Sequence, residues 1–291
     1  MELNKTEITT PPRPAATVLL LRDGDEGIEV LMIRRHAQSD VLGGAYVFPG
    51  GKLDPADTEI AITQRIDALA DDLHLALGEP YLDTATAAAL FVAAARETFE
   101  ECGILMAHGI GQEGVELALK RAREGASFAQ IIDELQLRIR TSGLVPWTRW
   151  ITPRMAAVMT KRFDTRFFVA EVPEGIAAQH DDHEATEAVW LRPRAALERY
   201  WKREIVLAPP QIQSLAHLAR HARAADVLEE ARGRLPPLIE PESFEEDGQR
   251  VIVYPGDPLH SVQVRAMPGP TRLRHREGRF EPVSGFEGLF A

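Results

Sequence analysis

The chain has 291 residues, of which 45% are hydrophobic and 26% charged, enough for one sizeable core with appendages. Its formal net charge of -11 argues against broad binding to nucleic acids or anionic membranes, because the summed field repels polyanions. Cys102 is the single cysteine, which excludes an intramolecular disulfide and a thiolate metal cluster. Because residues 1–14 lack the apolar stretch of a signal peptide and no long apolar run follows, we expect a cytoplasmic protein.

The first part of the chain predicts a β-hairpin followed by a glycine-rich turn. Two aliphatic runs, 16–21 and 28–35, flank a turn-like segment. Their apolar and polar residues do not alternate strictly, which is typical of strands covered on both faces. A short strand then ends in Phe48-Pro49-Gly50-Gly51. Glycines at such a turn let a backbone carbonyl approach a ligand closely, since no Cβ obstructs it.

Helices are predicted where apolar residues recur at three- and four-residue spacing. The predicted helices span residues 58–77, 83–102, 113–124, 127–140, 193–201 and 209–233. Further strands are indicated by β-branched and aromatic runs, at 144–153, 165–173, 188–191, 251–254, 261–266 and 271–274. The change of composition after residue 233 indicates a main domain, 12–233, and a small β-rich C-terminal appendage, 234–291.

One predicted helix concentrates carboxylates. Glu97, Glu100 and Glu101 stand three and four residues apart, off the apolar stripe, so they crowd one helical face. Arg96 is four residues before Glu100 and can pin one of these carboxylates. Oxygen ligands without histidine or cysteine nearby favour Mg²⁺ or Mn²⁺ over zinc, and phosphoryl chemistry is the natural use of such an ion. Alone, the cluster is more typical of a solvated helix face; its combination with the Pro-Gly-Gly turn and the terminating Gly103-Ile104 favours a site.

Together, the turn and the carboxylate helix resemble the box of the Nudix hydrolases, G-x5-E-x7-R-E-U-x-E-E-x-G-U, in which U is a bulky apolar residue. Gly51 matches the first glycine, and residues 96–104 match the second half except that Thr98 replaces an aliphatic residue. The chain between them is far longer than in the box, which implies an insertion, assigned to residues 52–82. A second, helical insertion is assigned to residues 110–141. The resemblance implies a Nudix α/β/α sandwich with a mixed sheet, helical insertions and the C-terminal appendage.

One glutamate of the box is missing in this chain. Counted back from Arg96, the expected glutamate is Ala88. A carboxylate from the insertion is the expected substitute, and the candidates are Asp54, Asp57 and Asp83.

The strand before the box resembles a coenzyme A subgroup, L-L-T-x-R-S-x3-R-x3-G-x3-F-P-G-G. Leu31, Arg35, Gly44 and residues 48–51 agree with it, whereas Asp40 stands in place of its second arginine, a reversal of charge. The long insertion and the segments 150–153 and 162–168 look like the acyl-coenzyme A diphosphatase branch.

The resemblance implies roles for individual residues. The expected metal ligands, for Mg²⁺ or Mn²⁺, are Glu97, Glu100, Glu101 and the carbonyl of Gly50. The expected catalytic residues are Glu101, Glu100, Arg96 and Glu184, with Glu187 as another candidate for the general base. The expected substrate-binding residues are Arg35, Gly51, Phe48 and Arg162.

The resemblance implies metal-dependent hydrolysis of a diphosphate linkage. Coenzyme A or acyl-coenzyme A is the favoured substrate, giving 3′,5′-ADP and phosphopantetheine or its acyl form. ADP-ribose or another nucleoside diphosphate derivative is the alternative, which Asp40 leaves open. A non-catalytic Nudix-fold ligand sensor or interaction module is the alternative of a different class. We expect no nucleic acid and no membrane as partner, and the C-terminal appendage is a candidate contact for a homodimer.

Overall fold

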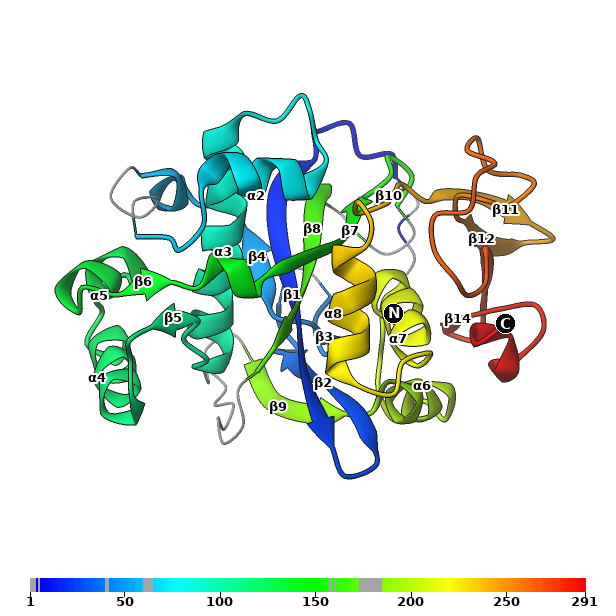
Figure 1. The fold of residues 1–291 in the computed structure, drawn as a ribbon. Helices are drawn as coiled ribbons and strands as arrows, with labels where there is room; N and C mark the ends of the chain where they lie inside the picture. The colour runs from blue at the N-terminus through cyan, green and yellow to red at the C-terminus, as the bar shows by residue number, and fades with distance from the viewer. Residues whose placement is uncertain are drawn as a thin grey trace.

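A mixed β-sheet lies between two layers of helices in the computed structural model (Figure 1), which describes residues 4, 6–39, 42–59, 65–156, 159, 161–172 and 185–291. Asp40 and Glu184 lie outside the described residues. The sheet has the order β10-β7-β8-β1-β2-β3, with β4 paired to β1 and β9 paired to β2. Its strands are β1 (Arg13–Gly24), β2 (Gly27–Arg35), β3 (Tyr46–Val47), β4 (Gly50–Lys52), β7 (Val145–Ile151), β8 (Phe163–Glu171), β9 (Ala185–Leu191) and β10 (Leu238–Ile239).

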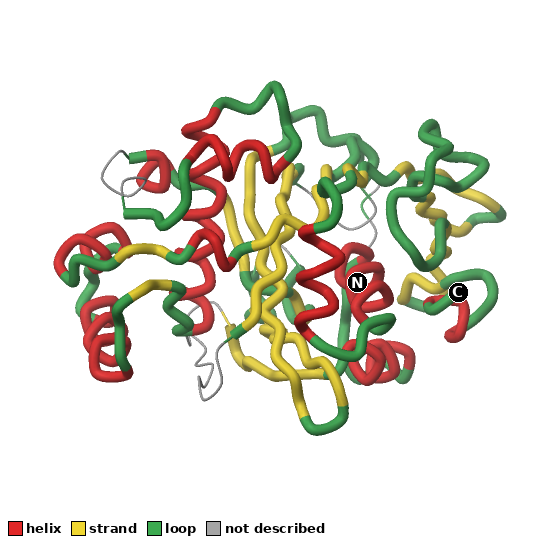
Figure 2. Tube along the Cα trace, viewed as in Figure 1, coloured by secondary structure: helices red, strands yellow, loops and turns green. Residues whose placement is uncertain are grey.

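The two faces of the sheet are covered by different helices (Figures 1 and 2). One face carries α2 (Ala70–Leu77) and α3 (Thr84–Cys102), and the other carries α6 (Pro193–Trp201), α7 (Pro209–Leu218) and α8 (Ala224–Arg232). A separate lobe holds β5 (Ala107–His108), α4 (Gln112–Arg123), α5 (Phe128–Glu134) and β6 (Arg138–Ile139). The β1–β2 hairpin is antiparallel and buried on both faces, which confirms the expected sandwich.

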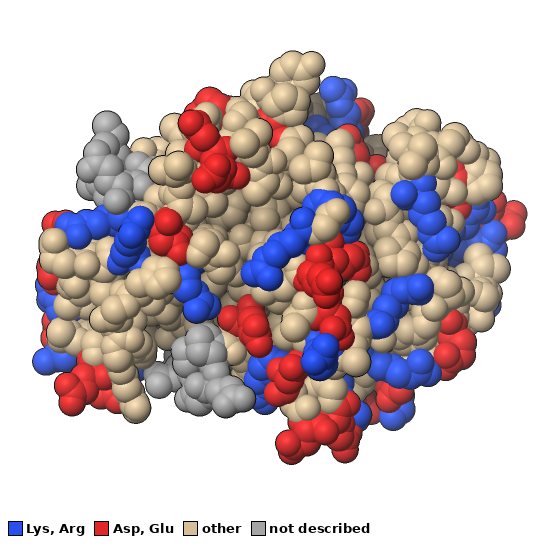
Figure 3. Space-filling view, in the orientation of Figure 1, with Lys and Arg blue, Asp and Glu red and all other residues tan. Residues whose placement is uncertain are grey.

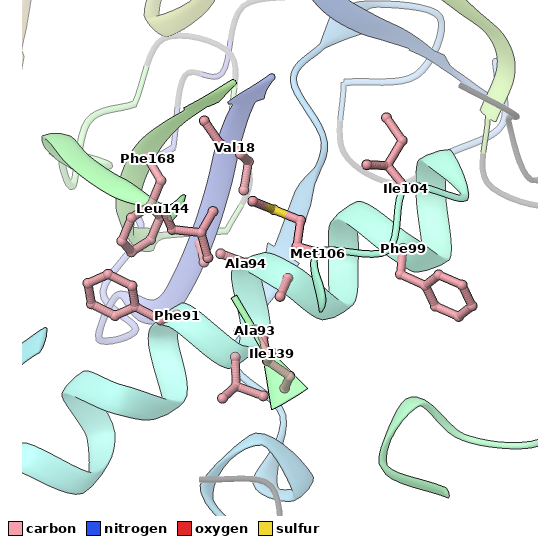
Figure 4. Close-up of a cluster of buried hydrophobic side chains, with 14 of the residues drawn as sticks. Val18, Phe91, Ala93, Ala94, Phe99, Ile104, Met106, Ile139, Leu144 and Phe168 are labelled. Carbon is pink, nitrogen blue, oxygen red and sulfur yellow. The ribbon is translucent and has the colours of Figure 1, made fainter. Parts of the chain in front are cut away.

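The long helix α3 begins and ends where its sequence predicts. Asp83 is the N-cap and its side chain accepts a hydrogen bond from the backbone N–H of Thr86 at 2.9 Å. Gly103 ends the helix in the left-handed conformation, with φ of 67°. The alanine-rich body allows close approach to the sheet, and Phe91 packs on Phe168 with ring centroids 4.7 Å apart (Figure 4). The buried face of α3 therefore fixes where its carboxylates lie.

The helix predicted at 58–77 is much shorter in the structure. A short 3-10 turn, η1 (Pro55–Thr58), precedes the undescribed residues 60–64, and α2 begins only at Ala70. Residues 66 and 67 are not helical, because Ile66 makes a β-bridge to Ile139 and the Asp67 carboxylate accepts hydrogen bonds from Thr141 and Ser142. These long-range contacts override the helical periodicity of the segment.

Three other predicted elements differ from the structure. The helix predicted at 209–233 is two helices, α7 and α8. The chain breaks between them because it is hydrogen-bonded to the β1–β2 hairpin, where the backbone N–H of Ala224 donates to Asp23 Oδ1 at 2.7 Å. The helix predicted at 127–140 ends at Glu134, and Gln136 then takes a positive φ of 52°. The segment 261–266 is irregular rather than a strand.

The C-terminal segment forms an antiparallel sheet that shares the main core. Its elements are β11 (Glu242–Glu246), β12 (Gln249–Val253), β13 (Arg272–Arg276), β14 (Arg279–Glu281) and the 3-10 turn η3 (Phe286–Leu289). Ile252, Tyr254 and Leu273 belong to the buried cluster that also contains Leu19 of β1. Since β10 pairs with β7, the C-terminal segment is continuous with the main sheet.

The surface mixes charges of both signs. Basic and acidic side chains are interspersed over the face drawn in Figure 3. Within the described residues, none of the helices has the length and apolarity needed to cross a bilayer.

Candidate active site

The carboxylates of α3 open into a cavity of about 1010 Å³. Eight of the residues predicted from the sequence line this cavity: Arg35, Phe48, Gly50, Gly51, Arg96, Glu97, Glu100 and Glu101. They come from β2, from the turn around β4 and from the last two turns of α3. Two segments that are far apart in the chain therefore meet here as the two halves of the box.

Arg96 organises the carboxylates. Its Nη1 lies 2.8 Å from Glu97 Oε1 and 2.9 Å from Glu100 Oε2. Its Nε and Nη2 donate to the two carboxylate oxygens of Asp57 at 2.8 and 3.0 Å, and Nη2 also donates to the carbonyl of Lys52 at 3.0 Å. Although burial by itself would lower the pKa of Arg96, the hydrogen bonds and charges of these carboxylates raise it. The guanidinium is thus permanently charged and fixed in position.

Asp57 supplies the acidic group that the count back from Arg96 misses. It is only 2% exposed and binds Arg96 through both oxygens. Asp57 stands six residues after Gly51, which is the acidic position of the box when it is counted forward from the glycine. Counted in this way, the extra chain would begin after Asp57, and the insertion at residues 52–82 stays a prediction.

The other candidates for the acidic position have different roles. Ala88 is fully buried in the core face of α3, where a carboxylate would be desolvated. Asp54 caps η1 by accepting the backbone N–H of Ala56, and Asp83 caps α3.

The glycine turn fits closely against α3. The backbone N–H of Gly50 donates to Glu101 Oε2 at 2.8 Å. A Cβ at Gly51 would collide with the Glu97 carboxylate, and one at Gly50 would collide with the backbone of Ala16 and Thr17. Gly50 therefore requires glycine, because the obstacle there is backbone and its φ is 155°, whereas a Cβ at Gly51 would oblige the Glu97 side chain to move.

Arg35, the last residue of β2, also lines the cavity. Its Nη1 is 4.0 Å from Glu101 Oε1. Its Nε is buried and has no hydrogen-bond partner in the described part of the chain. A buried guanidinium N–H without an acceptor, at the wall of a cavity, suits an anionic ligand such as a phosphate oxygen.

Two candidates from the sequence lie away from the cavity. Arg162 donates to the carbonyl of Thr152 at 2.7 Å and to Glu240 Oε1 at 3.3 Å, and it is not among the described lining residues. Glu187 accepts a hydrogen bond from Tyr46 at 2.5 Å, and Tyr46 packs in the cluster on the sheet face opposite α3. The pKa of Tyr46 is raised by burial and by Glu187.

The donor set of the cavity suits a hard divalent cation. Glu97, Glu100 and Glu101 offer only oxygen atoms, which Mg²⁺ and Mn²⁺ prefer. Glu97 and Glu100 bind Arg96, whereas Glu101 accepts the backbone N–H of Gly50. Among the described residues, the tight group of potential metal ligands is His217, His221 and Glu230, on α7, α8 and the turn between them. Those three residues do not line the cavity.

The buried His217 is expected to make stability fall as the pH falls. Burial lowers its pKa to about 4, against the attraction of Glu230, whereas an unfolded histidine titrates near 6.5. Between these values the unfolded state binds more protons, so unfolding becomes easier by about 3 kcal/mol from pH 7 to pH 4. Denaturant unfolding at several pH values measures this slope. His217→Gln should flatten it between pH 6.5 and 4; an unchanged slope would assign the effect to other groups.

A mixed sheet between helical layers, with an Arg-Glu-x-x-Glu-Glu helix facing a glycine turn, defines the Nudix hydrolase class. The family model described as the NUDT19 Nudix domain matches residues 9–218, so the chain belongs to this family of Nudix hydrolases.

Named relatives and a solved structure are similar to the chain. Acyl-coenzyme A diphosphatase NUDT19 from Xenopus laevis is 28% identical over 229 residues, which cover 67% of this chain and 60% of that protein. The Homo sapiens protein of the same name is 27% identical, over 88% of this chain and 77% of that protein. A crystal structure of a NUDIX hydrolase from Alicyclobacillus acidocaldarius has a TM-score of 0.60 and 28% identity, covering 79% of this chain and 99% of that one.

Proposed function

We propose that the chain hydrolyses a diphosphate linkage in a nucleoside diphosphate derivative, with coenzyme A or acyl-coenzyme A as the preferred substrate. The observation that carries the proposal is the meeting of Glu97, Glu100 and Glu101 with Arg35 in one cavity. The chain's similarity to proteins named acyl-coenzyme A diphosphatase supports the choice of substrate.

In the proposed reaction, a water oxygen attacks one phosphorus and the bond from that phosphorus to the bridging oxygen breaks. Coenzyme A then gives 3′,5′-ADP and phosphopantetheine, and acyl-coenzyme A gives the acyl form. A bound Mg²⁺ or Mn²⁺ would neutralise the diphosphate and lower the pKa of a water molecule. Glu97, Glu100, Glu101 and the carbonyl of Gly50 would hold this ion.

The chain's own residues orient the substrate and accept a proton. Arg35 would bind a phosphate oxygen through its unpartnered Nε, which fixes the diphosphate beside α3. Glu101 is 4% exposed and held by the Gly50 N–H, so it is the candidate base for the attacking water. Arg96 keeps Glu97 and Glu100 aimed at the cavity through fixed hydrogen bonds. Glu184 stays a second candidate base, as a prediction from the sequence.

A substrate panel tests the proposal. The purified chain is incubated with Mg²⁺ or Mn²⁺ and with coenzyme A, an acyl-coenzyme A, ADP-ribose or NADH, and the phosphomonoester products are quantified. We expect coenzyme A or its acyl form to have the highest kcat/KM, and EDTA to abolish turnover. Preference for ADP-ribose would support the alternative substrate class, and no cleavage under either metal would favour a ligand sensor. The homodimer and the cytoplasmic location stay predictions.

A further inference from the structure

The cavity has an acidic end and an apolar end on opposite sides of the sheet. Along β1, Ala16 and Val18 pack under α3, whereas Ala15 and Thr17 face the cavity. Two strands pair with different parts of β1: β4 pairs with residues 15–17, and β2 pairs with residues 21–24. The cavity therefore continues from the α3 carboxylates, beyond β4, to the other face of the sheet. We call this second part, on the face covered by α7 and the C-terminal sheet, the chamber.

The chamber has apolar walls from three parts of the chain. Trp150 and Phe167 form its floor on the main sheet, with ring centroids 6.1 Å apart. Ile252 reaches it from β12 and Ala208 from the start of α7. Exposed basic side chains, including Lys52, stand among the other lining residues. A volume near the upper end of the usual range for small-molecule sites leaves room for a long, largely apolar group.

One buried polar atom stands out in this apolar wall. Gln211, in the first turn of α7, is 7% exposed and lines the cavity. Its Oε1 is buried and has no hydrogen-bond donor among the described residues. A buried acceptor left unpaired is costly, so it indicates a ligand that brings an N–H group into an otherwise apolar chamber.

We infer that this chamber binds the pantetheine arm of the substrate, with an amide N–H of the arm donating to Gln211 and Ile252 of the C-terminal sheet closing over it. The arm combines amide N–H groups with alkyl segments. The N–H groups match the unpaired acceptor Gln211 Oε1, and the alkyl segments match the apolar walls. The 3′,5′-ADP half carries phosphate charges that suit the exposed basic residues of the lining, such as Lys52, rather than the apolar walls. The inference rests on the proposed function, and it makes the C-terminal sheet part of substrate recognition.

Calorimetric binding of the two half-products tests the inference without turnover. 4′-Phosphopantetheine and 3′,5′-ADP are titrated separately, with Mg²⁺ present, into the full chain and its variants. Gln211→Leu should weaken 4′-phosphopantetheine by roughly 3- to 30-fold, the worth of one hydrogen bond in a dry site. Ile252→Trp should weaken it by about tenfold or more by filling the chamber. Both should leave the affinity for 3′,5′-ADP within about twofold.

The controls separate the chamber from general damage. Val262→Trp changes an exposed residue of the C-terminal segment and should alter neither affinity. Thermal melting reports whether each variant folds. If Ile252→Trp does not fold, the binding data for Gln211→Leu decide whether the inference holds. Equal weakening of both half-products, or of neither, in folded variants would overturn the inference. Selective weakening of 3′,5′-ADP would also overturn it and assign the chamber to the nucleotide. Failure of the substrate panel alone would leave these binding results intact.

Discussion

Glu101→Gln is expected to lower kcat for the diphosphate substrate by roughly 100- to 10,000-fold, the usual contribution of a positioned acid–base group. Glutamine keeps an oxygen that can accept the N–H of Gly50, which now lies 2.8 Å from Glu101 Oε2, so the turn should stay in place. The substitution removes the negative charge of Glu101, a residue that is 4% exposed and lines the cavity. Steady-state kinetics with saturating Mg²⁺ measures the change.

Two further variants make this result interpretable. Glu100→Gln removes a carboxylate that is 44% exposed and bound to Arg96, and we expect a loss of the same order if both hold the metal. Glu113→Gln changes an exposed glutamate of α4 outside the cavity and should leave kcat unchanged. If raising the Mg²⁺ concentration partly restores Glu100→Gln, metal affinity is the cause. Unchanged turnover in both cavity variants would move the active site elsewhere.

The elements that carry the site are those whose local sequence agrees with their tertiary contacts. The α3 helix has a capping Asp83, an alanine-rich body and a terminating Gly103, and its structure follows the sequence at both ends. The Phe48-Pro49-Gly50-Gly51 turn is likewise visible in the local sequence, because the position whose N–H donates to Glu101 has no room for a Cβ and is a glycine. Such local consistency makes the two halves of the box predictable.

Other features depend on partners that lie far along the chain. Asp67 receives hydrogen bonds from residues more than seventy positions away, and these bonds keep the segment before α2 out of a helix. Arg162 precedes β8 and would suit a phosphate, but its guanidinium is taken up by Glu240 and Thr152. Gln211 carries no motif at all, and only the fold brings it to the cavity. Periodicity and motif spacing contain no information on such pairs.

Asp57→Asn is expected to destabilise the chain by about 3 kcal/mol, because it leaves the guanidinium of Arg96 without the carboxylate that binds it through two oxygens. Asp57 is 2% and Arg96 13% exposed, so water replaces this partner only in part. Chemical denaturation measures the change in the free energy of unfolding. We also expect kcat to fall by roughly 10- to 100-fold, since Arg96 then orients Glu97 and Glu100 less firmly.

Matched variants distinguish this role from simple loss of an acidic residue in the insertion. Asp83→Asn keeps a good N-cap on α3 and should change stability by less than about 0.5 kcal/mol. Ala88→Glu places a carboxylate at a fully buried position, so it should destabilise the chain and fail to rescue Asp57→Asn. If Asp57→Asn instead behaves like Asp83→Asn in both stability and kcat, Arg96 is held well enough by Glu97 and Glu100 alone. The acidic position of the box would then be dispensable in this chain, and the long insertion after it would have no bearing on the site.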